Sequence, residues 1–265
     1  MKVIYALTIV FSSLSLCRAQ NSNGPRRTPD AAYTRQMIRL LTGLQKNPWL
    51  GWESGTEVVV RYFGDGDPAA TPRALVQPDI MYKVLEADKL FIRTQSYKGK
   101  LTRQDFLVKD QGGLDAAWPG VRNPSAADVE IDGFTVACFL SESVLTEFPG
   151  GSRVTKEWTL ASHPSIVLRK EVKGGPGWGV TSASVIRRVG EREFPCVEIK
   201  KRMRLSHRGP IDLITTQYLS PDVPGHLIEQ IEEFFEVKEG QVSSAPYLVV
   251  HQKAVGLKLS QPTRT

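Results

Sequence analysis

The chain has 265 residues, with 34 lysine and arginine residues against 28 aspartate and glutamate residues, a formal net charge of +6. This length is sufficient for one large or two small domains with a true hydrophobic core. The charge excess is mild and calls for no nucleic-acid partner, which usually leaves a concentrated basic surface. Three cysteines are too few for a scaffold built on disulfides.

The first 19 residues have the features of a secretory signal peptide. Lys2 precedes the apolar segment Val3–Leu16, and cleavage is expected after Ala19. This predicts a secreted or periplasmic mature chain of about 246 residues. An alternative is lipoprotein anchoring at Cys17, although Leu16 is bulky for the position before a lipidated cysteine. No later apolar run is long enough to predict a transmembrane segment.

A polar segment and one helix are expected next. Residues 20–29 are rich in Asn, Ser, Gly, Pro and Arg, which predicts a disordered lead-in. The segment Asp30–Gln45 then follows a helical pattern, ended by Gly43 and Pro48. Its apolar residues recur at helical spacing: Met37, Leu40, Leu41 and Leu44.

From Trp49 onward the pattern changes to that of a mainly β protein. Strand-like runs of six or seven residues are separated by turn signals about ten residues apart, which predicts an antiparallel meander. The first runs are Thr56–Tyr62, Ile80–Leu85, Leu90–Ser96 and Thr102–Val108. Residues 110–125 are rich in Gly, Pro and Asp and are expected to form a long loop, after which strands resume at Phe134–Leu140.

Two later segments, about 130–172 and 189–236, align with each other. Placing Glu130–Leu140 over Val189–Ile199 puts Cys138 on Cys196. This pattern predicts an internal duplication of a hairpin unit. Residues 30–260 are therefore expected to form a single β-rich domain that contains two similar units.

The alignment also matches aromatic and proline positions. Trp158 falls on Tyr218, and Pro164 falls on Pro224 within the stretch YLSPDVPGHLIEQ. Proline cannot donate to a strand ladder and glycine permits a reversal, so Pro224 and Gly225 are expected to form a turn. We interpret these residues as structural.

The second unit carries a resemblance to a group of uncharacterised secreted bacterial proteins. Its pattern is Gly190, then Cys196, then YLSPDVPGHLI over 218–228. The order of a signal peptide, a helix and a long meander also resembles the layout of LolA-type periplasmic lipoprotein carriers. That resemblance spans about Thr56–Leu259 and implies a curved open or half barrel that binds a lipid or a lipidated protein. It has no diagnostic motif, and a fold analogy does not carry function with it.

One segment is ambiguous from the sequence. Residues 227–239 place apolar side chains at helical spacing, but the alignment pairs the start of this segment with a strand. We expect a strand at its start and leave the remainder open.

Cys138 and Cys196 have three interpretations. Cys138 alternates with apolar residues and is expected in the core, whereas Cys196 shares a strand face with Phe194 and Glu198. The two residues could both be packed thiols, could form a disulfide between the repeat units, or could include one reactive thiol.

Candidate binding residues are basic or aromatic. Lys200, Arg202 and Arg204 share one strand face, which is most simply solvated but would suit an anionic lipid or polymer surface. Aromatic side chains would pack the helix on the sheet or line a ligand cavity: Trp49, Trp52, Trp158 and Tyr218.

The sequence offers no strong catalytic motif. There is no Gly-x-Ser-x-Gly elbow, no phosphate-binding loop and no dinucleotide fingerprint. The histidines are far apart and lack metal-ligand spacing, so no metal or cofactor is expected, and His163 and His226 are expected as exposed turn residues. The function expected is non-catalytic binding or scaffolding outside the cytoplasm, with a lipid or lipoprotein carrier as one form. The alternative is a secreted hydrolase with a dispersed site.

Overall fold

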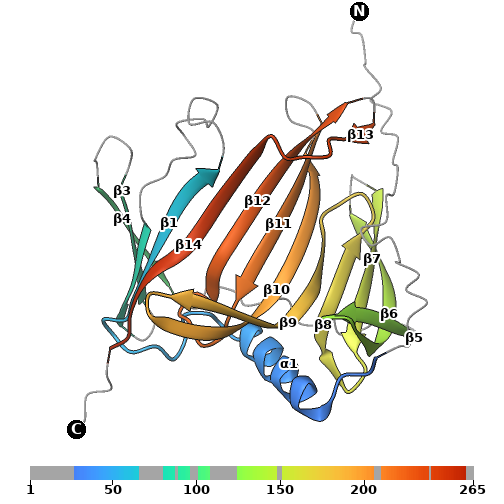
Figure 1. The fold of residues 1–265 in the computed structure, drawn as a ribbon, viewed down its shortest axis with the longest axis horizontal. Helices are drawn as coiled ribbons and strands as arrows, with labels where there is room; N and C mark the ends of the chain where they lie inside the picture. Colours follow the sequence, from blue (N-terminus) through green and yellow to red (C-terminus); the bar gives the residue numbers. More distant parts are fainter. Residues whose placement is uncertain are drawn as a thin grey trace, which may run out of the picture.

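The computed structural model describes residues 27–65, 80–86, 89–95, 101–107, 124–147, 151–205, 210–238 and 240–260. In this part of the chain a single helix accompanies a 14-stranded antiparallel sheet that does not close (Figure 1). This confirms the predicted fold class, a curved open sheet with one N-terminal helix. The signal segment and the loop over 110–123 lie outside the described residues.

The elements follow one another in chain order as a nearly continuous meander. They are α1 (Ala31–Leu44), β1 (Glu57–Asp65), β2 (Ile80–Glu86), β3 (Lys89–Gln95), β4 (Leu101–Leu107), β5 (Ser125–Ile131), β6 (Phe134–Glu147), β7 (Gly151–Leu160), β8 (His163–Val172), β9 (Gly177–Val189), β10 (Arg192–Leu205), β11 (Ile211–Leu219), β12 (Leu227–Lys238), β13 (Gln241–Val242) and β14 (Leu248–Lys258).

The strands pair in the order β4-β3-β2-β1-β14-β12-β11-β10-β9-β8-β7-β6-β5, and β13 pairs with β12. The last strand, β14, therefore lies between β1 and β12 and joins the two ends of the chain. Figure 1 shows β14, β12, β11 and β10 as a broad twisted surface, with β5 to β8 curled at one side of it.

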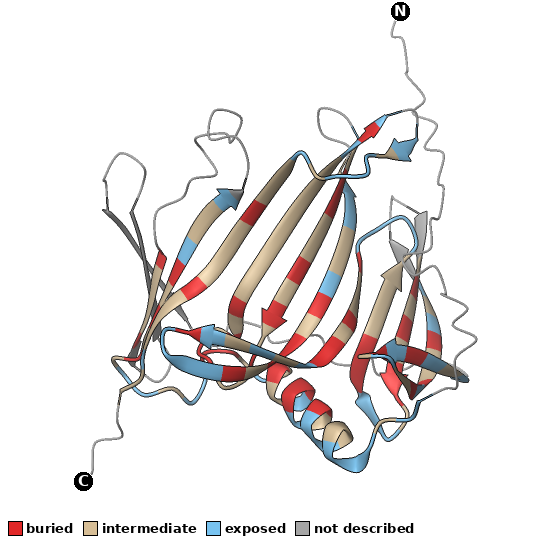
Figure 2. Ribbon diagram, in the orientation of Figure 1, coloured by how far each residue is buried: buried red, intermediate tan, exposed pale blue. Residues whose placement is uncertain are grey.

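The helix begins and packs as its sequence predicts. The Asp30 carboxylate caps it by accepting a hydrogen bond from the Tyr33 backbone N–H at 2.8 Å. One face of α1 is buried against the sheet and the other is exposed (Figure 2). The buried residues are those of the predicted apolar stripe: Met37, Leu40, Leu41 and Leu44.

The sheet divides between β8 and β9. These strands share only the pairs Arg169↔Gly179 and Lys170↔Trp178, after which β9 follows β10 as a long ribbon. On the far side, the curled strands approach β9, where the Asp132 backbone N–H donates to the Thr181 carbonyl at 3.2 Å. One hydrophobic cluster lies under α1 and includes residues from both sides of this division, such as Leu168 of β8 and Val180 of β9, while a second surrounds Phe194 and Cys196.

The described part of the segment that the sequence left open, Leu227–Lys238, is extended as β12. It pairs with β11 on one side, and on the other side Glu229–Phe234 pair with β14. This backbone pairing satisfies many of the segment's hydrogen-bonding groups, which outweighs its helical spacing of apolar residues.

The two aligned segments share an order of four strands but differ at their prolines. β5 to β8 and β9 to β12 each place a cysteine in the second strand and an aromatic residue in the third. Pro164, however, is exposed at the start of β8, whereas Pro224 is buried in the longer turn between β11 and β12. The predicted equivalence of these prolines is therefore wrong, and the duplication itself stays a prediction.

Candidate functional site

A cavity of about 500 Å³ lies at the end of α1. Its walls come from the helix C-terminus, the β8–β9 hairpin, β10, β11 and the β11–β12 turn. The lining residues are Leu44, Pro48, Lys170, Val172, Pro176, Gly177, Trp178, Lys201, Gln217, Leu219, Gly225, His226 and Leu227.

The cavity forms where the helix stops covering the sheet. Val197 and Ile199 of β10 are buried in the cluster under α1, and alternation places Lys201 on the same face. Because α1 ends at Leu44, no described helix covers the sheet beyond Ile199. The space is walled instead by Trp178 of the neighbouring hairpin.

The lining combines apolar side chains with a few polar ones. The apolar residues include Trp178, Leu219 and Leu227, while the basic residues are Lys170 and Lys201. Lys170 also forms an ion pair at 3.0 Å with Glu157, whose side chain is buried. Among the described residues, no aspartate or glutamate lines the cavity, and the charged side chains there are the two lysines.

His226 is the polar residue of the wall that departs most from expectation. Only 8% of its surface is exposed, which corrects the prediction of an exposed turn residue. Burial lowers the pKa of its ring from the usual value to about 4, so the imidazole is neutral above that pH. Its backbone φ is +61°, in the left-handed region. His163, by contrast, is exposed, as predicted.

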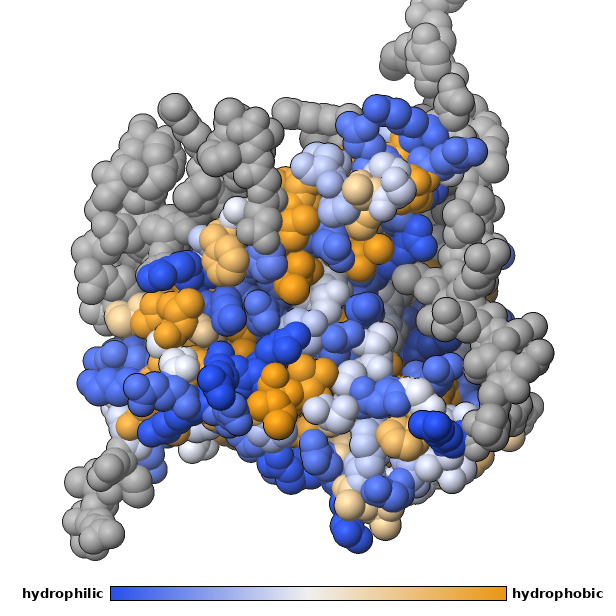
Figure 3. Space-filling view, in the orientation of Figure 1, coloured by the Kyte–Doolittle hydropathy of each residue, from blue (hydrophilic) through white to orange (hydrophobic). Residues whose placement is uncertain are grey.

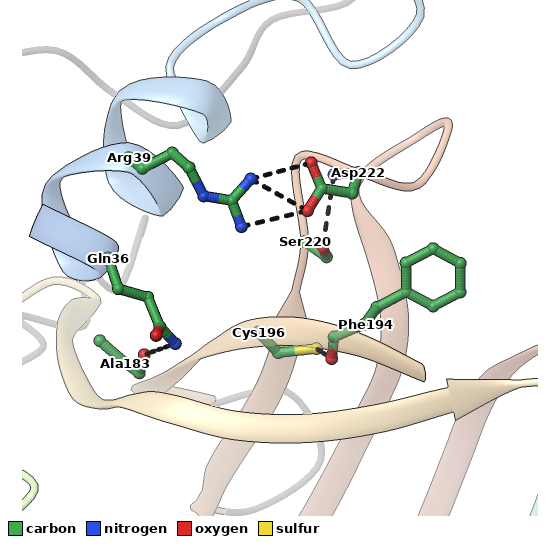
Figure 4. Close-up of polar contacts among 7 residues, drawn as sticks. All are labelled: Gln36, Arg39, Ala183, Phe194, Cys196, Ser220 and Asp222. Atoms are coloured by element: carbon green, nitrogen blue, oxygen red, sulfur yellow. Dashed lines mark hydrogen bonds and ion pairs between the residues drawn. The ribbon is translucent and has the colours of Figure 1, made fainter. Parts of the chain in front are cut away.

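The turn that carries His226 is fixed to the helix side of the molecule. Arg39 of α1 binds the Asp222 carboxylate at 3.2 Å (Figure 4). The Gly225 backbone N–H donates to the Pro48 carbonyl at 2.9 Å, and the Ser220 N–H donates to the His226 carbonyl at 2.8 Å. The backbone of this turn is therefore held by contacts with α1 and with Pro48, as well as by its own hydrogen bond between Ser220 and His226.

A second hollow of about 130 Å³ lies on the same face of the sheet, lined by Tyr62, Gln230, Glu232, Val250 and Gln252. Side-chain amides connect it to the cavity: Gln217 donates to Gln230, which donates in turn to Glu232. A polar path thus leads from the cavity across β11 and β12. In the face drawn in Figure 3, apolar residues form separate patches among hydrophilic ones.

The four aromatic residues proposed from the sequence lie elsewhere. Trp49 stacks on Tyr82, with ring centroids 5.4 Å apart, and Trp52 packs in the same small cluster. Trp158 and Tyr218 each lie under an arginine guanidinium. None of the four lines the cavity, whereas Trp178 does. The signal for Trp178 was its glycine-rich setting, GGPGWG, which is typical of a hairpin with room beside its backbone.

The three basic residues proposed for an anionic surface are largely paired. Alternation places Lys200, Arg202 and Arg204 on the face opposite Lys201. Arg202 forms a hydrogen-bonded ion pair with the buried carboxylate of Asp212, and Lys200 lies 3.7 Å from Glu198. Arg204 is exposed. Arg202 thus takes part in an ion pair within the sheet, and the anionic-surface role of the three residues stays a prediction.

Both cysteines are buried, free thiols. Each Sγ donates to the carbonyl two residues earlier, Cys138 to Val136 and Cys196 to Phe194. They belong to different hydrophobic clusters. Burial raises the pKa of each thiol to about 12, so neither is an activated nucleophile.

One turn brings together the residue types of a hydrolytic triad without its geometry. Ser220, Asp222 and His226 are close in sequence, but the Ser220 hydroxyl accepts from the Asp222 N–H, and the Asp222 carboxylate binds Arg39. No hydrogen bond joins the His226 ring to either residue in the described chain. Across the same residues, no group of three or more His, Cys, Asp or Glu side chains is placed to hold a metal ion. The one described helix, α1, is too short and too polar to cross a membrane.

Comparison of the chain with known protein families, with curated proteins and with solved structures finds no match.

Proposed function

We propose that this protein is a non-catalytic binding protein for a small amphipathic molecule, such as a lipid, or for the acyl chain of a lipidated protein. The observation that carries the proposal is the 500 Å³ cavity at the end of α1. Ligand cavities of this size are commonly lined by apolar side chains, with a few polar groups that orient the ligand. The lining at the end of α1 has this composition.

The chemistry of the walls favours an anionic head group. Trp178, Leu219 and Leu227 offer an apolar surface for a hydrocarbon chain. Lys170 and Lys201 place cationic side chains in the same wall, and no acidic residue is among the described residues that line it. We infer that the ligand has an apolar body and a negatively charged end.

The proposal includes export. The signal-like segment Val3–Leu16 and cleavage after Ala19 would deliver the chain to the periplasm or the outside of the cell. A protein that binds a water-insoluble molecule there would act as a carrier, in keeping with the LolA-like layout. Mass spectrometry of the protein from its own envelope tests this part. A chain that begins at Gln20 supports it, and retention of residues 1–19 contradicts it.

Binding is tested by isothermal titration calorimetry with three probes. Decane-1-sulfonate has a chain and a permanent charge, decan-1-ol has a chain alone, and methanesulfonate has a head group alone. We expect saturable binding of the sulfonate below its micelle concentration, weaker binding of the alcohol, and no measurable binding of methanesulfonate. The absence of saturable binding by both long-chain probes would contradict the proposed function.

Neighbouring lysines provide a matched pair of variants. Lys201→Met changes the cavity wall, whereas Lys200→Met changes the adjacent residue on the opposite face of β10. We expect Lys201→Met to weaken binding of decane-1-sulfonate by about tenfold and to leave decan-1-ol binding unchanged. Lys200→Met should bind both probes as the wild type does. Equal effects of the two variants would contradict a specific role of the cavity charge.

A further inference from the structure

His226 is a largely buried polar side chain in the cavity wall. Less than a tenth of its surface is exposed, and no hydrogen bond joins its ring to a described residue, yet its ring nitrogens are not among the described side-chain atoms that are fully buried without a partner. The ring therefore keeps a hydrogen-bonding position at the cavity surface, where a ligand can reach it. The open space beside this residue is the cavity that it lines.

The backbone of His226 adopts a conformation that is strained for a residue with a side chain. His226 has φ of +61°, and Gly225 before it has φ of +80°. A glycine at position 226 would adopt this conformation without strain. Strained residues of this kind cluster at ligand sites, where the surrounding structure holds them. Here the contacts from Pro48 and Ser220 hold the turn in place.

The charged groups around the cavity define what would satisfy the ring. Lys170 and Lys201 line the wall from β8 and β10, and Glu157 of β7 is engaged with Lys170. Within the turn of His226, Asp222 is engaged by Arg39 of α1. The charged side chains that the described cavity wall shares with His226 are therefore lysines, which favour an anionic ligand group over a cation.

We propose that His226 is the head-group contact of the cavity, and that its imidazole hydrogen-bonds the anionic group of a bound amphiphile on the wall that Lys201 shares. This assignment rests on the proposed function and adds the group that recognises the ligand. Burial lowers the pKa of the free ring to about 4, so at neutral pH the imidazole is neutral and has one N–H to donate to the ligand. The shared chemistry is that of a sulfonate, phosphate or carboxylate.

The test is an NMR titration of the histidine rings, with and without saturating decane-1-sulfonate. The charge of this probe does not titrate, so any change in a ring pKa belongs to the protein. A bound anion favours the protonated imidazole, and we expect the pKa of His226 to rise by at least about one unit. The exposed ring of His163 should not change and provides the internal control.

His226→Asn supplies the matching variant, because asparagine tolerates positive φ. We expect about tenfold weaker binding of decane-1-sulfonate and unchanged binding of decan-1-ol. An unmoved pKa of His226 together with full binding by the variant would overturn the assignment and leave the proposed function standing. If neither long-chain probe binds the wild type, both proposals fail. An equal shift of the His226 pKa with methanesulfonate at the same concentration would show that a head group alone is sufficient. That result would contradict an amphiphile as the ligand.

Discussion

Gly225 lies directly against the indole of Trp49. A Cβ added to Gly225 would stand 2.7 Å from Trp49 Cζ2 and 3.0 Å from Cη2. The two residues come from opposite ends of the described chain, one after α1 and one in the β11–β12 turn. Their contact fixes the turn that holds His226 beside the cavity.

Replacement of Gly225 by alanine is therefore expected to destabilise the fold twice over. Its φ of +80° strains any residue with a Cβ, and the indole blocks the added methyl group. We expect Gly225→Ala to lower the free energy of unfolding by about 2–4 kcal/mol in urea denaturation. Gly190→Ala isolates the strain, because Gly190 has φ of +61° and open space around it. A loss no greater than that of Gly190→Ala would contradict the close contact.

The cysteines should behave as packed thiols. With pKa values raised to about 12 by burial, Cys138 and Cys196 are expected to resist iodoacetamide at neutral pH in the native protein. After unfolding in guanidinium without reductant, mass spectrometry should find both sites alkylated. Recovery of both residues unlabelled, in a cross-linked peptide, would instead establish a disulfide and contradict their placement in separate clusters.

Acid should destabilise the protein partly through His226. Burial depresses the pKa of the folded ring to about 4, below its usual value near 6.5. Between these values the unfolded chain binds more protons, so stability is lost as the pH falls through this window. We expect the free energy of unfolding to drop by about 2–3 kcal/mol more in the wild type than in His226→Asn from pH 7 to pH 4. Parallel urea-unfolding profiles for the two proteins would refute this.

The ion pair between Arg202 and the buried Asp212 should contribute more to the free energy of unfolding than exposed ion pairs do. Asp212 is 1% exposed, and its carboxylate forms an ion pair with the Arg202 guanidinium. Asp212→Asn leaves that cation without its charge partner, and we expect a loss of about 2 kcal/mol in urea denaturation. Glu193→Gln breaks the exposed pair with Arg188 and should change stability little. Similar losses in both variants would argue that Arg202 is solvated in solution.

The sequence predicted the elements better than the site. The spacing of Met37, Leu40 and Leu44 is local information, and so are the turn signals between strands, which explains why the helix and the meander were predictable. β12 was ambiguous because its pairing with β11 and β14 decides its conformation, and strand pairing is not a local property.

The cavity depends on where elements from distant parts of the chain end. Lys201 and Lys170 line one cavity because α1 ends before it covers the part of β10 beyond Ile199, and because β8 and β9 separate after two residue pairs. His226 was expected to be exposed because turn residues usually are. Its burial follows from the packing of Trp49 and Arg39 on the turn, contacts that span most of the sequence.

The most direct test of the proposed cavity is fluorescence quenching by 12-bromododecanoate, whose bromine quenches a tryptophan that it contacts. Trp178 lines the cavity and Trp52 does not. The account predicts saturable quenching in the wild type and in Trp52→Phe, and its loss in Trp178→Phe while calorimetry still detects binding. Quenching that survives Trp178→Phe, or that never saturates, would contradict a ligand site at the end of α1.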